Sequence, residues 1–287
     1  MNRLPTRGAA ALLLGVLLCA SAAAQNAAAT KKLPVTKTAA TKASAFQPVI
    51  EPRAVDLLKA MSERLAAAQS LSFSAVASYE YPSRLGPPIL YSMRYDVMLQ
   101  RPDKLRVRIP GDGPASEFII DGKEMVAYAP AGNLVAAADA PPTLEAALKK
   151  AYDSAAIYFP FTDLLLPDPY VAIAQAAILA YVVGPSSIIG GVNTETVVWA
   201  NDDVFLQMWI GVDDKLPRRM RAIFRADPRG LRHDLEFGDW KLGPTLSGDA
   251  FDTAKAKAGQ PMPFAVPGPA VPMSMKPRAG QPTPKPQ

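Results

Sequence analysis

The segment Ile89–Leu99 reads ILYSMRYDVML, and its side chains alternate in character along its whole length. Its odd positions are all apolar: Ile89, Tyr91, Met93, Tyr95, Val97 and Leu99. Polar side chains at Ser92, Arg94 and Asp96 occupy even positions. Because successive side chains of a strand point to opposite faces, this pattern predicts a long strand with one apolar face.

The same alternation returns on both sides of this segment. Residues 71–81 place Phe73 and Tyr79 on one side and serines on the other, and Gly86-Pro87-Pro88 then interrupts the chain. We therefore expect residues 71–81 and 89–99 to pair as a hairpin. Further strands are predicted at residues 104–109, 115–120, 124–128, 192–200, 204–210, 218–226 and 231–240. Short polar turns join most of them, which favours an antiparallel sheet.

Three stretches carry helical signals instead. Residues 54–68 have apolar side chains at helical spacing. Thr143 is a suitable N-cap for a helix over residues 144–152, and Asp168-Pro169 begins a pattern that predicts a helix through Ile178 and Leu179. The fold class predicted from the residues is α+β, with an antiparallel sheet covered by a few helices.

The N-terminus has the features of a secretory signal peptide at residues 1–24. Arg3 and Arg7 precede an apolar stretch at residues 9–20, and the small residues that signal peptidase recognises follow up to Ala24. We expect cleavage near Ala24 and a periplasmic or secreted protein. Leu18 precedes Cys19 at the position where lipidation requires a small residue, so we expect ordinary cleavage rather than a lipoprotein. The mature chain then has no cysteine for disulfides or thiolate metal sites.

Charge is unevenly distributed along the chain. Residues 54–254 contain 19 Lys and Arg against 25 Asp and Glu, although the whole chain has a net charge of +5. The excess positive charge lies in residues 1–24, in a predicted disordered linker at 25–53 and in a predicted disordered, proline-rich tail at 255–287. These tails suit transient contact with an anionic membrane surface, or a plain spacer role. The acidic core offers no basic stripe for nucleic acid.

Few residues suggest catalysis or metal binding. His233 is the only histidine, and no G-x-S-x-G elbow accompanies it, so a structural role is favoured over a hydrolase-type one. The pairs Asp202-Asp203 and Asp213-Asp214 are better explained as turn residues than as calcium ligands. The arginines Arg218, Arg219, Arg221 and Arg225 match either anionic headgroups or a solvated strand face that neutralises nearby acids, and the second interpretation is favoured. We expect no cofactor and no metal.

Five short motifs carry a family resemblance. They are Phe118–Lys123, Tyr181–Gly184, Leu206–Ile210, Leu216–Arg219 and Phe237–Trp240. In this order they resemble the motifs of a family of predicted periplasmic proteins (domain of unknown function 2092), over residues 54 to about 252. That family is similar in fold to the lipoprotein-localisation carriers LolA and LolB. The resemblance implies a strongly curved antiparallel sheet, a half-open barrel closed by helices around a hydrophobic cavity. Asn193-Thr194-Glu195 stands where relatives often have a polar pair with histidine, so no metal or acid–base role follows.

Aromatic and methionine side chains concentrate on the predicted strands, where they line a pocket or fill a core. The residues expected to bind a ligand are Tyr79, Tyr91, Met93, Tyr95, Leu105, Val107, Met208, Trp209 and Phe224. We expect a folded domain at residues 54–254 that binds a lipid, an acyl chain or a lipidated segment without catalysis. The first alternative is a protein-interaction or structural module of the cell envelope that uses its helices or a sheet edge. The second is a hydrolase-type enzyme that involves His233.

Overall fold

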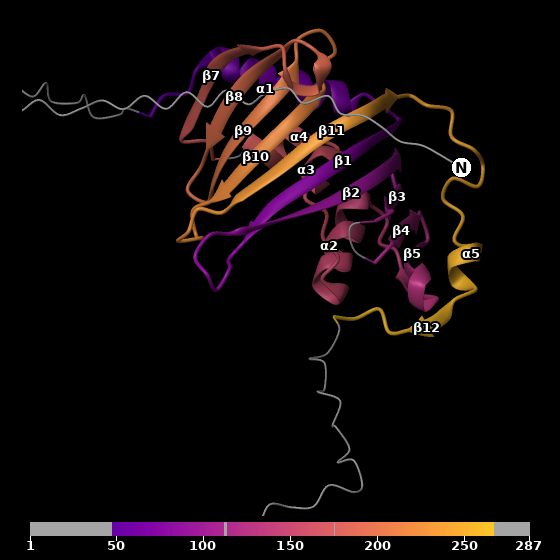
Figure 1. Cartoon of the computed structure of the whole chain (residues 1–287). Coiled ribbons are helices and arrows are strands. Elements are labelled where there is room, and N and C mark those ends of the chain that lie inside the picture. The colour runs from indigo at the N-terminus through magenta and orange to yellow at the C-terminus, as the bar shows by residue number, and fades with distance from the viewer. Residues whose placement is uncertain (1–47, 112–113, 175, 267–287) are drawn as a thin grey trace, which may run out of the picture. The chain divides into compact units, whose positions relative to one another are not determined.

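The structure is a computed structural model that describes residues 48–111, 114–174 and 176–266 (Figure 1). The predicted signal peptide and most of the predicted linker lie outside the described residues, as do residues 267–287 of the predicted tail. Within the described ranges, no helix combines the length and the apolar character that a membrane crossing requires.

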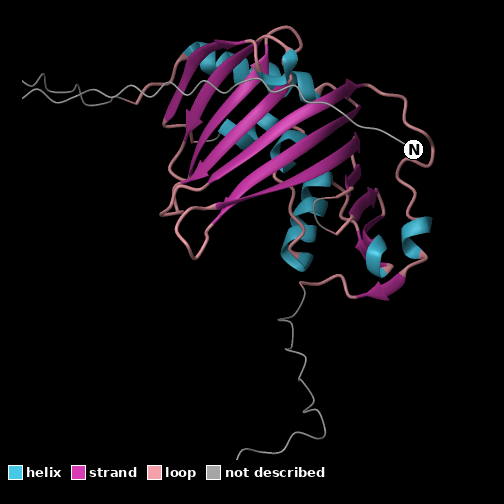
Figure 2. Cartoon of the chain, in the orientation of Figure 1, coloured by secondary structure: helices cyan, strands magenta, loops and turns pink. Residues whose placement is uncertain are grey.

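One sheet of 12 strands forms the framework, and Figure 2 shows the helices gathered mainly behind it. The strand order is β12-β6-β5-β4-β3-β2-β1-β11-β10-β9-β8-β7, and every neighbouring pair is antiparallel except β12 with β6. The strands are β1 (Ser70–Tyr81), β2 (Ile89–Gln100), β3 (Lys104–Ile109), β4 (Ser116–Asp121), β5 (Glu124–Ala129), β6 (Leu134–Asp139), β7 (Leu179–Ser186), β8 (Thr194–Ala200), β9 (Val204–Gly211), β10 (Pro217–Phe224), β11 (Arg232–Leu242) and β12 (Gln260–Met262).

The predicted hairpin of β1 and β2 is confirmed. Its register runs without interruption from Ser70 opposite Gln100 to Tyr81 opposite Ile89. The alternation buries one face at the base of the hairpin, where Phe73 and Leu99 enter the core. Towards the turn the same strands are exposed on both faces. The sequence pattern therefore identifies the strands correctly, but burial changes along them.

Helices and their loops cover the apolar face of the sheet. The helices are α1 (Pro52–Ala66), α2 (Leu144–Ala155), α3 (Thr162–Leu165), α4 (Pro169–Ala174) and α5 (Ala254–Lys257), with short 3-10 turns at Pro130–Gly132 and Ile189–Gly191. Leu58, Met61 and Leu65 of α1 enter the same core as the strand residues. The predicted cap of α2 is confirmed, since the Thr143 side chain accepts a hydrogen bond from the Ala146 amide at 3.2 Å.

Arg101, just after β2, ties two helix ends to the sheet. Its guanidinium donates hydrogen bonds to the carbonyls of Leu165 at 2.9 Å, Ala68 at 3.2 Å and Leu166 at 3.3 Å. The last carbonyls of a helix have no partner within the helix, and they carry partial negative charge. Arg101 therefore holds the ends of α1 and α3 in place, and α3 contributes to the candidate site.

The strongly curved half-open barrel expected from the family resemblance is wrong, because the 12-stranded sheet is not strongly curled (Figure 1). Its terminal strands β7 and β12 do not pair with each other among the described residues. The strand alternation specifies which face is buried, but strand number, bulges and packing against helices set the curvature.

The expected helix through Ile178 and Leu179 is also wrong at its C-terminal end. Helix α4 stops at Ala174, Ala176 has a left-handed φ of 54°, and Leu179 begins strand β7. Leu179 pairs with Ala200 of β8, so cross-strand hydrogen bonding overrides the helical spacing of the apolar residues.

The folded chain extends past residue 254, where the unfolded tail was predicted to begin. Strand β12 runs parallel to β6, with Gln260 opposite Leu134. Ala256 of α5 is buried against Val126 and Val135. A few apolar residues thus anchor residues 255–266 to the sheet despite the basic and proline-rich composition.

Candidate functional site

A cavity of about 560 Å³ lies between the sheet and the segment that contains α3 and α4. The sheet side comes from β1, β2 and β8–β11, which converge here from distant parts of the sequence. The opposite side is formed by Tyr158 and Pro160 before α3, Asp163 in α3, and Ala172 and Ile173 in α4.

The inner wall of the cavity is mainly apolar, although the buried Trp199 Nε1 in it has no hydrogen-bond partner among the described residues. Trp199, Leu206 and Met220 are buried strand residues, and Ile173 of α4 faces them across the cavity. Leu235 of β11 completes this wall. Side chains of this kind bind apolar groups in many orientations, since dispersion contacts and water exclusion are not directional.

The mouth of the cavity is aromatic. His233 stacks on Tyr79 with ring centroids 6.5 Å apart, and it meets the edge of Phe224 at 5.2 Å. The sheet register explains the cluster, because His233 lies opposite Tyr79 on one side and opposite Ala222 on the other. Tyr158 contributes a further exposed ring from the helix side.

Three ionisable groups line the cavity, of which Tyr95 is buried and Tyr158 and Asp163 remain exposed at its edge. Removal from water raises the pKa of Asp163, and it also raises the pKa of Tyr95. The pKa of Tyr158 is raised first by desolvation and then by the negative charge of Asp163. Both phenols therefore keep their protons, and the Asp163 carboxylate disfavours another negative charge in the cavity.

An aromatic cluster beside the cavity holds the helix side in position. Phe161 meets the edges of Phe73 at 5.4 Å and Tyr95 at 5.2 Å, and it stacks on Phe159 at 5.8 Å. Such pairs add to the stabilisation from burial. Sequence reasoning missed this part of the site, although four of the five residues 157–161 are large or aromatic: Ile157, Tyr158, Phe159 and Phe161.

Three of the residues expected to bind a ligand line this cavity: Tyr79, Tyr95 and Phe224. Leu105, Val107 and Met208 lie in the main core. Val107 also borders a second cavity, of about 370 Å³, between β3–β6 and residues 262–265.

The other three expected residues lie elsewhere. Met93 packs against the edge of the main core, and Tyr91 is exposed and stacks on Tyr79 at 5.7 Å. Trp209 is not among the cavity residues, because Met208 and Ile210 on either side of it point into the core. The guanidinium of Arg219 lies 5.5 Å from its ring centroid instead. The alternation of β9 assigns Trp209 to the opposite face of the sheet.

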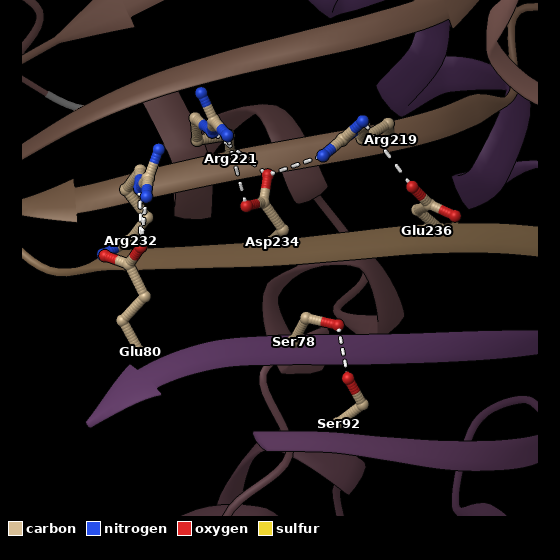
Figure 3. Close-up of polar contacts among 8 residues, drawn as sticks. All are labelled: Ser78, Glu80, Ser92, Arg219, Arg221, Arg232, Asp234 and Glu236. Atoms are coloured by element: carbon tan, nitrogen blue, oxygen red, sulfur yellow. Dashed lines mark hydrogen bonds and ion pairs between the residues drawn. The ribbon is translucent and has the colours of Figure 1, made fainter. Parts of the chain in front are cut away.

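That opposite face carries a ladder of ion pairs (Figure 3). Arg221 donates to Asp234 at 3.0 Å, and Arg219 contacts both Asp234 at 3.2 Å and Glu236 at 3.5 Å. Arg232 pairs with Glu80, and the Ser78 and Ser92 hydroxyls bond at 2.8 Å. Acids on the neighbouring strand thus pair with Arg219 and Arg221, and this supports the interpretation as a solvated strand face.

The acidic turn at Asp213-Asp214 has a local structural role through Asp214. Asp214 accepts a hydrogen bond from the Leu216 amide at 3.1 Å and pairs with Arg218. In the described part of the chain, no group of three or more His, Cys, Asp or Glu side chains is placed to hold a metal ion. The ring of His233 stacks on the ring of Tyr79 and meets the edge of the ring of Phe224.

The β7 edge of the sheet is partly occupied by the residues that precede α1. Ala180 donates to the Val49 carbonyl at 2.9 Å and accepts from the Glu51 amide at 2.7 Å. The Glu51 carboxylate also accepts from the Val182 amide at 3.0 Å. These bonds use backbone groups that an added strand from a partner needs.

Comparisons with known proteins give a family and several similar folds. The model of a family described as "Predicted periplasmic protein (DUF2092)" matches residues 54–265. A sequence comparison with curated proteins gives no match.

Among solved structures, LprF from Mycobacterium bovis is 16% identical with a TM-score of 0.44, over 71% of this chain and 99% of that one. An uncharacterised conserved protein from Thermus thermophilus is 14% identical with a TM-score of 0.43, over 74% of this chain and 99% of that one. A LolA superfamily protein from Nitrosomonas europaea is 12% identical with a TM-score of 0.34, over 69% of this chain and 96% of that one.

Proposed function

The chain belongs to the DUF2092 family of predicted periplasmic proteins, and from this premise we propose that it binds an apolar ligand non-catalytically in the cavity beneath α3 and α4. The ligand class is a lipid, an acyl chain or a lipidated segment. The observation that carries the proposal is the cavity itself, whose about 560 Å³ falls within the range of roughly 300–1,000 Å³ typical of small-molecule sites.

The walls support an apolar ligand rather than a polar one. The inner surface consists of buried aliphatic and aromatic side chains, and hydrogen-bonding groups concentrate near the mouth at Tyr158, Asp163 and His233. An amphiphile would bury its chain among Trp199 and Met220 and leave its polar end at the mouth. Burial of each methylene group then contributes about 0.8 kcal/mol.

The negative charge of the Asp163 carboxylate restricts which polar end a ligand can have. This carboxylate lies in surroundings that raise its pKa, so a second carboxylate beside it would be disfavoured. A ligand with an uncharged polar end therefore fits the cavity better than a free fatty acid.

The alternative function as a protein-interaction module receives less support. The β7 edge already bonds to Val49 and Glu51, and β12 covers part of the β6 edge. The hydrolase alternative requires a nucleophile beside His233, where the neighbouring rings are Tyr79 and Phe224.

The test is a titration with N-phenyl-1-naphthylamine, an uncharged fluorescent probe, on the wild type and on Ala222→Phe. Ala222 is a half-buried residue of β10 that lines the cavity, so a phenyl group there takes up ligand volume. We expect the variant to bind the probe at least about tenfold more weakly, because roughly 1.4 kcal/mol of contact energy corresponds to that factor. Ala137→Phe, on the exposed side of β6, is the matched control and should bind like the wild type.

A wild type that binds no uncharged apolar probe would contradict the proposal. The same holds if Ala137→Phe weakens binding as much as Ala222→Phe. The unfolding temperature of each variant is measured alongside, so that loss of the fold is not mistaken for loss of the ligand.

A further inference from the structure

The turn of the β1–β2 hairpin projects beyond β3, the strand on one side of it. The register between β2 and β3 ends at Asp96 opposite Arg108, and the register between β1 and β11 ends at Tyr79 opposite His233. Residues 81–91, which we name the hairpin tip, therefore extend past β3 on one side, and on the other side residues 229–232 of the β10–β11 connection lie beside them (Figure 1).

The hairpin tip exposes large apolar side chains. Leu85 is 93% exposed and Leu90 is 62% exposed, and Tyr81, Ile89 and Tyr91 are also exposed. A soluble surface rarely gathers this many large apolar groups on one projecting loop without a partner. The tyrosines add rings with one apolar and one polar end, which favour the boundary between water and lipid.

Arginines border this apolar tip on one side, and Arg232 beside them pairs with Glu80. Arg84 lies in its turn, and the adjacent turn between β10 and β11 contains Arg225 and Arg229. The one acid of that turn, Asp227, uses its carboxylate to accept hydrogen bonds from the backbone amides of Arg229 and Leu231. The Asp203 carbonyl accepts a hydrogen bond from the Arg225 amide at 2.8 Å, so the acidic turn at Asp202 and Asp203 lies beside Arg225, whereas Arg229 borders the hairpin tip itself.

The tip also lies next to the cavity mouth. Tyr91 of the tip stacks on Tyr79, and Tyr79 and Phe224 both line the cavity. A surface bound by the tip would therefore face the entrance through which a ligand passes.

We propose that the hairpin tip docks on an anionic lipid bilayer, with Leu85 and Leu90 entering the interfacial layer and Arg84 and Arg229 meeting the phosphates of the headgroups. Interfacial binding of this kind combines buried apolar area with attraction of arginine for anionic lipid. The inference concerns a surface outside the cavity, and it stands whether or not the cavity holds a ligand.

The test is flotation of the full chain with two sets of vesicles, one containing phosphatidylglycerol and the other made of phosphatidylcholine alone. We expect the wild type to bind the anionic vesicles more strongly. Leu85→Asp and Leu90→Asp should each lower the partition coefficient at least about tenfold, because a charge replaces an inserted leucine. Arg84→Gln combined with Arg229→Gln should lower binding to the anionic vesicles only.

The matched control is Ile188→Asp. Ile188 is 83% exposed in the connection between β7 and β8, at the opposite end of the sheet from the hairpin tip, so this variant should bind like the wild type. The basic segments 25–53 and 255–287 are present in every variant. Equal binding by all variants would therefore show that these segments bind the vesicles, and it would overturn the proposal. A wild type that binds neither set of vesicles would overturn the proposal too. The same holds if it captures a protein partner instead and Leu85→Asp abolishes that capture.

Discussion

At the scale of single residues, Arg101 shows how one charged side chain positions the site. Its guanidinium reaches the Leu65 carbonyl in the last turn of α1 and the Leu165 carbonyl at the end of α3, and α3 carries Asp163 at the cavity. Burial lowers the pKa of Arg101, but an arginine in a protein does not lose its proton, so the group remains charged. The sequence gives no sign of this role, since two of the carbonyl partners lie 33 and 65 positions away along the chain.

We expect Arg101→Met to lower the free energy of unfolding by about 2–3 kcal/mol, because several carbonyls at helix ends lose a charged donor. Urea denaturation measures the change. Arg94→Met is the matched control, since Arg94 forms an exposed ion pair with Asp96 and should contribute less than about 1 kcal/mol. Equal effects of the two substitutions would show that Arg101 is only a surface charge.

Asp163 provides a prediction of pH dependence. Its pKa is raised in the fold from the ordinary value of 3.8, so the folded state binds the proton more tightly than the unfolded state does. The resulting loss of stability is fully present above the folded-state pKa and disappears as pH falls below 3.8. Asp163→Asn should therefore unfold at a slightly higher temperature than the wild type at neutral pH, since water screens the exposed side of Asp163, and the difference should shrink on acidification.

Thermal unfolding across this pH range measures the effect of Asp163. The control is Asp202→Asn in an exposed turn, which removes one negative charge without removing one from the cavity. A difference between wild type and Asp163→Asn that grows as pH falls would have the wrong sign for a desolvated carboxylate.

At the scale of elements, the strands are far easier to predict than the parts that cover them. Residues 89–99 alternate strictly, and β2 begins at Ile89 and extends to Gln100. Leu179–Ser186 lacks a clean alternation, with Val182 and Val183 adjacent, and the helical spacing before it wrongly extends the predicted helix to Leu179. Tertiary pairing with β8 decides that segment, and pairing of this kind cannot be read from local spacing.

Helix α2 begins at a cap that the sequence does reveal. Thr143 accepts the hydrogen bond of the Ala146 amide at the start of α2, and α2 leads directly to Tyr158 at the cavity. We expect Thr143→Ala to lower the free energy of unfolding by about 1 kcal/mol, whereas Thr143→Ser keeps the hydroxyl and should change it little. Urea denaturation of both variants is the measurement, and indistinguishable midpoints for serine and alanine would contradict a capping role.

For the whole molecule, the alternation of apolar residues determines which face of the sheet is buried. It does not determine whether that face borders a packed core or a cavity. Leu105 and Met208 fill a packed core, whereas Tyr79 and Phe224 border open space, although all four belong to the same strand pattern. The difference arises where α3 and α4 leave a space above the strands that they face. Neither this spacing nor the curvature of the sheet follows from periodicity.

Native mass spectrometry of the full chain isolated without detergent shows whether the cavity beneath α3 and α4 holds an apolar ligand. We expect the wild type to carry an additional bound mass that organic extraction removes and that Ala222→Phe lacks, while Ala137→Phe retains it. A wild type that shows only the mass of the bare chain, and that also takes up no N-phenyl-1-naphthylamine, would contradict the account.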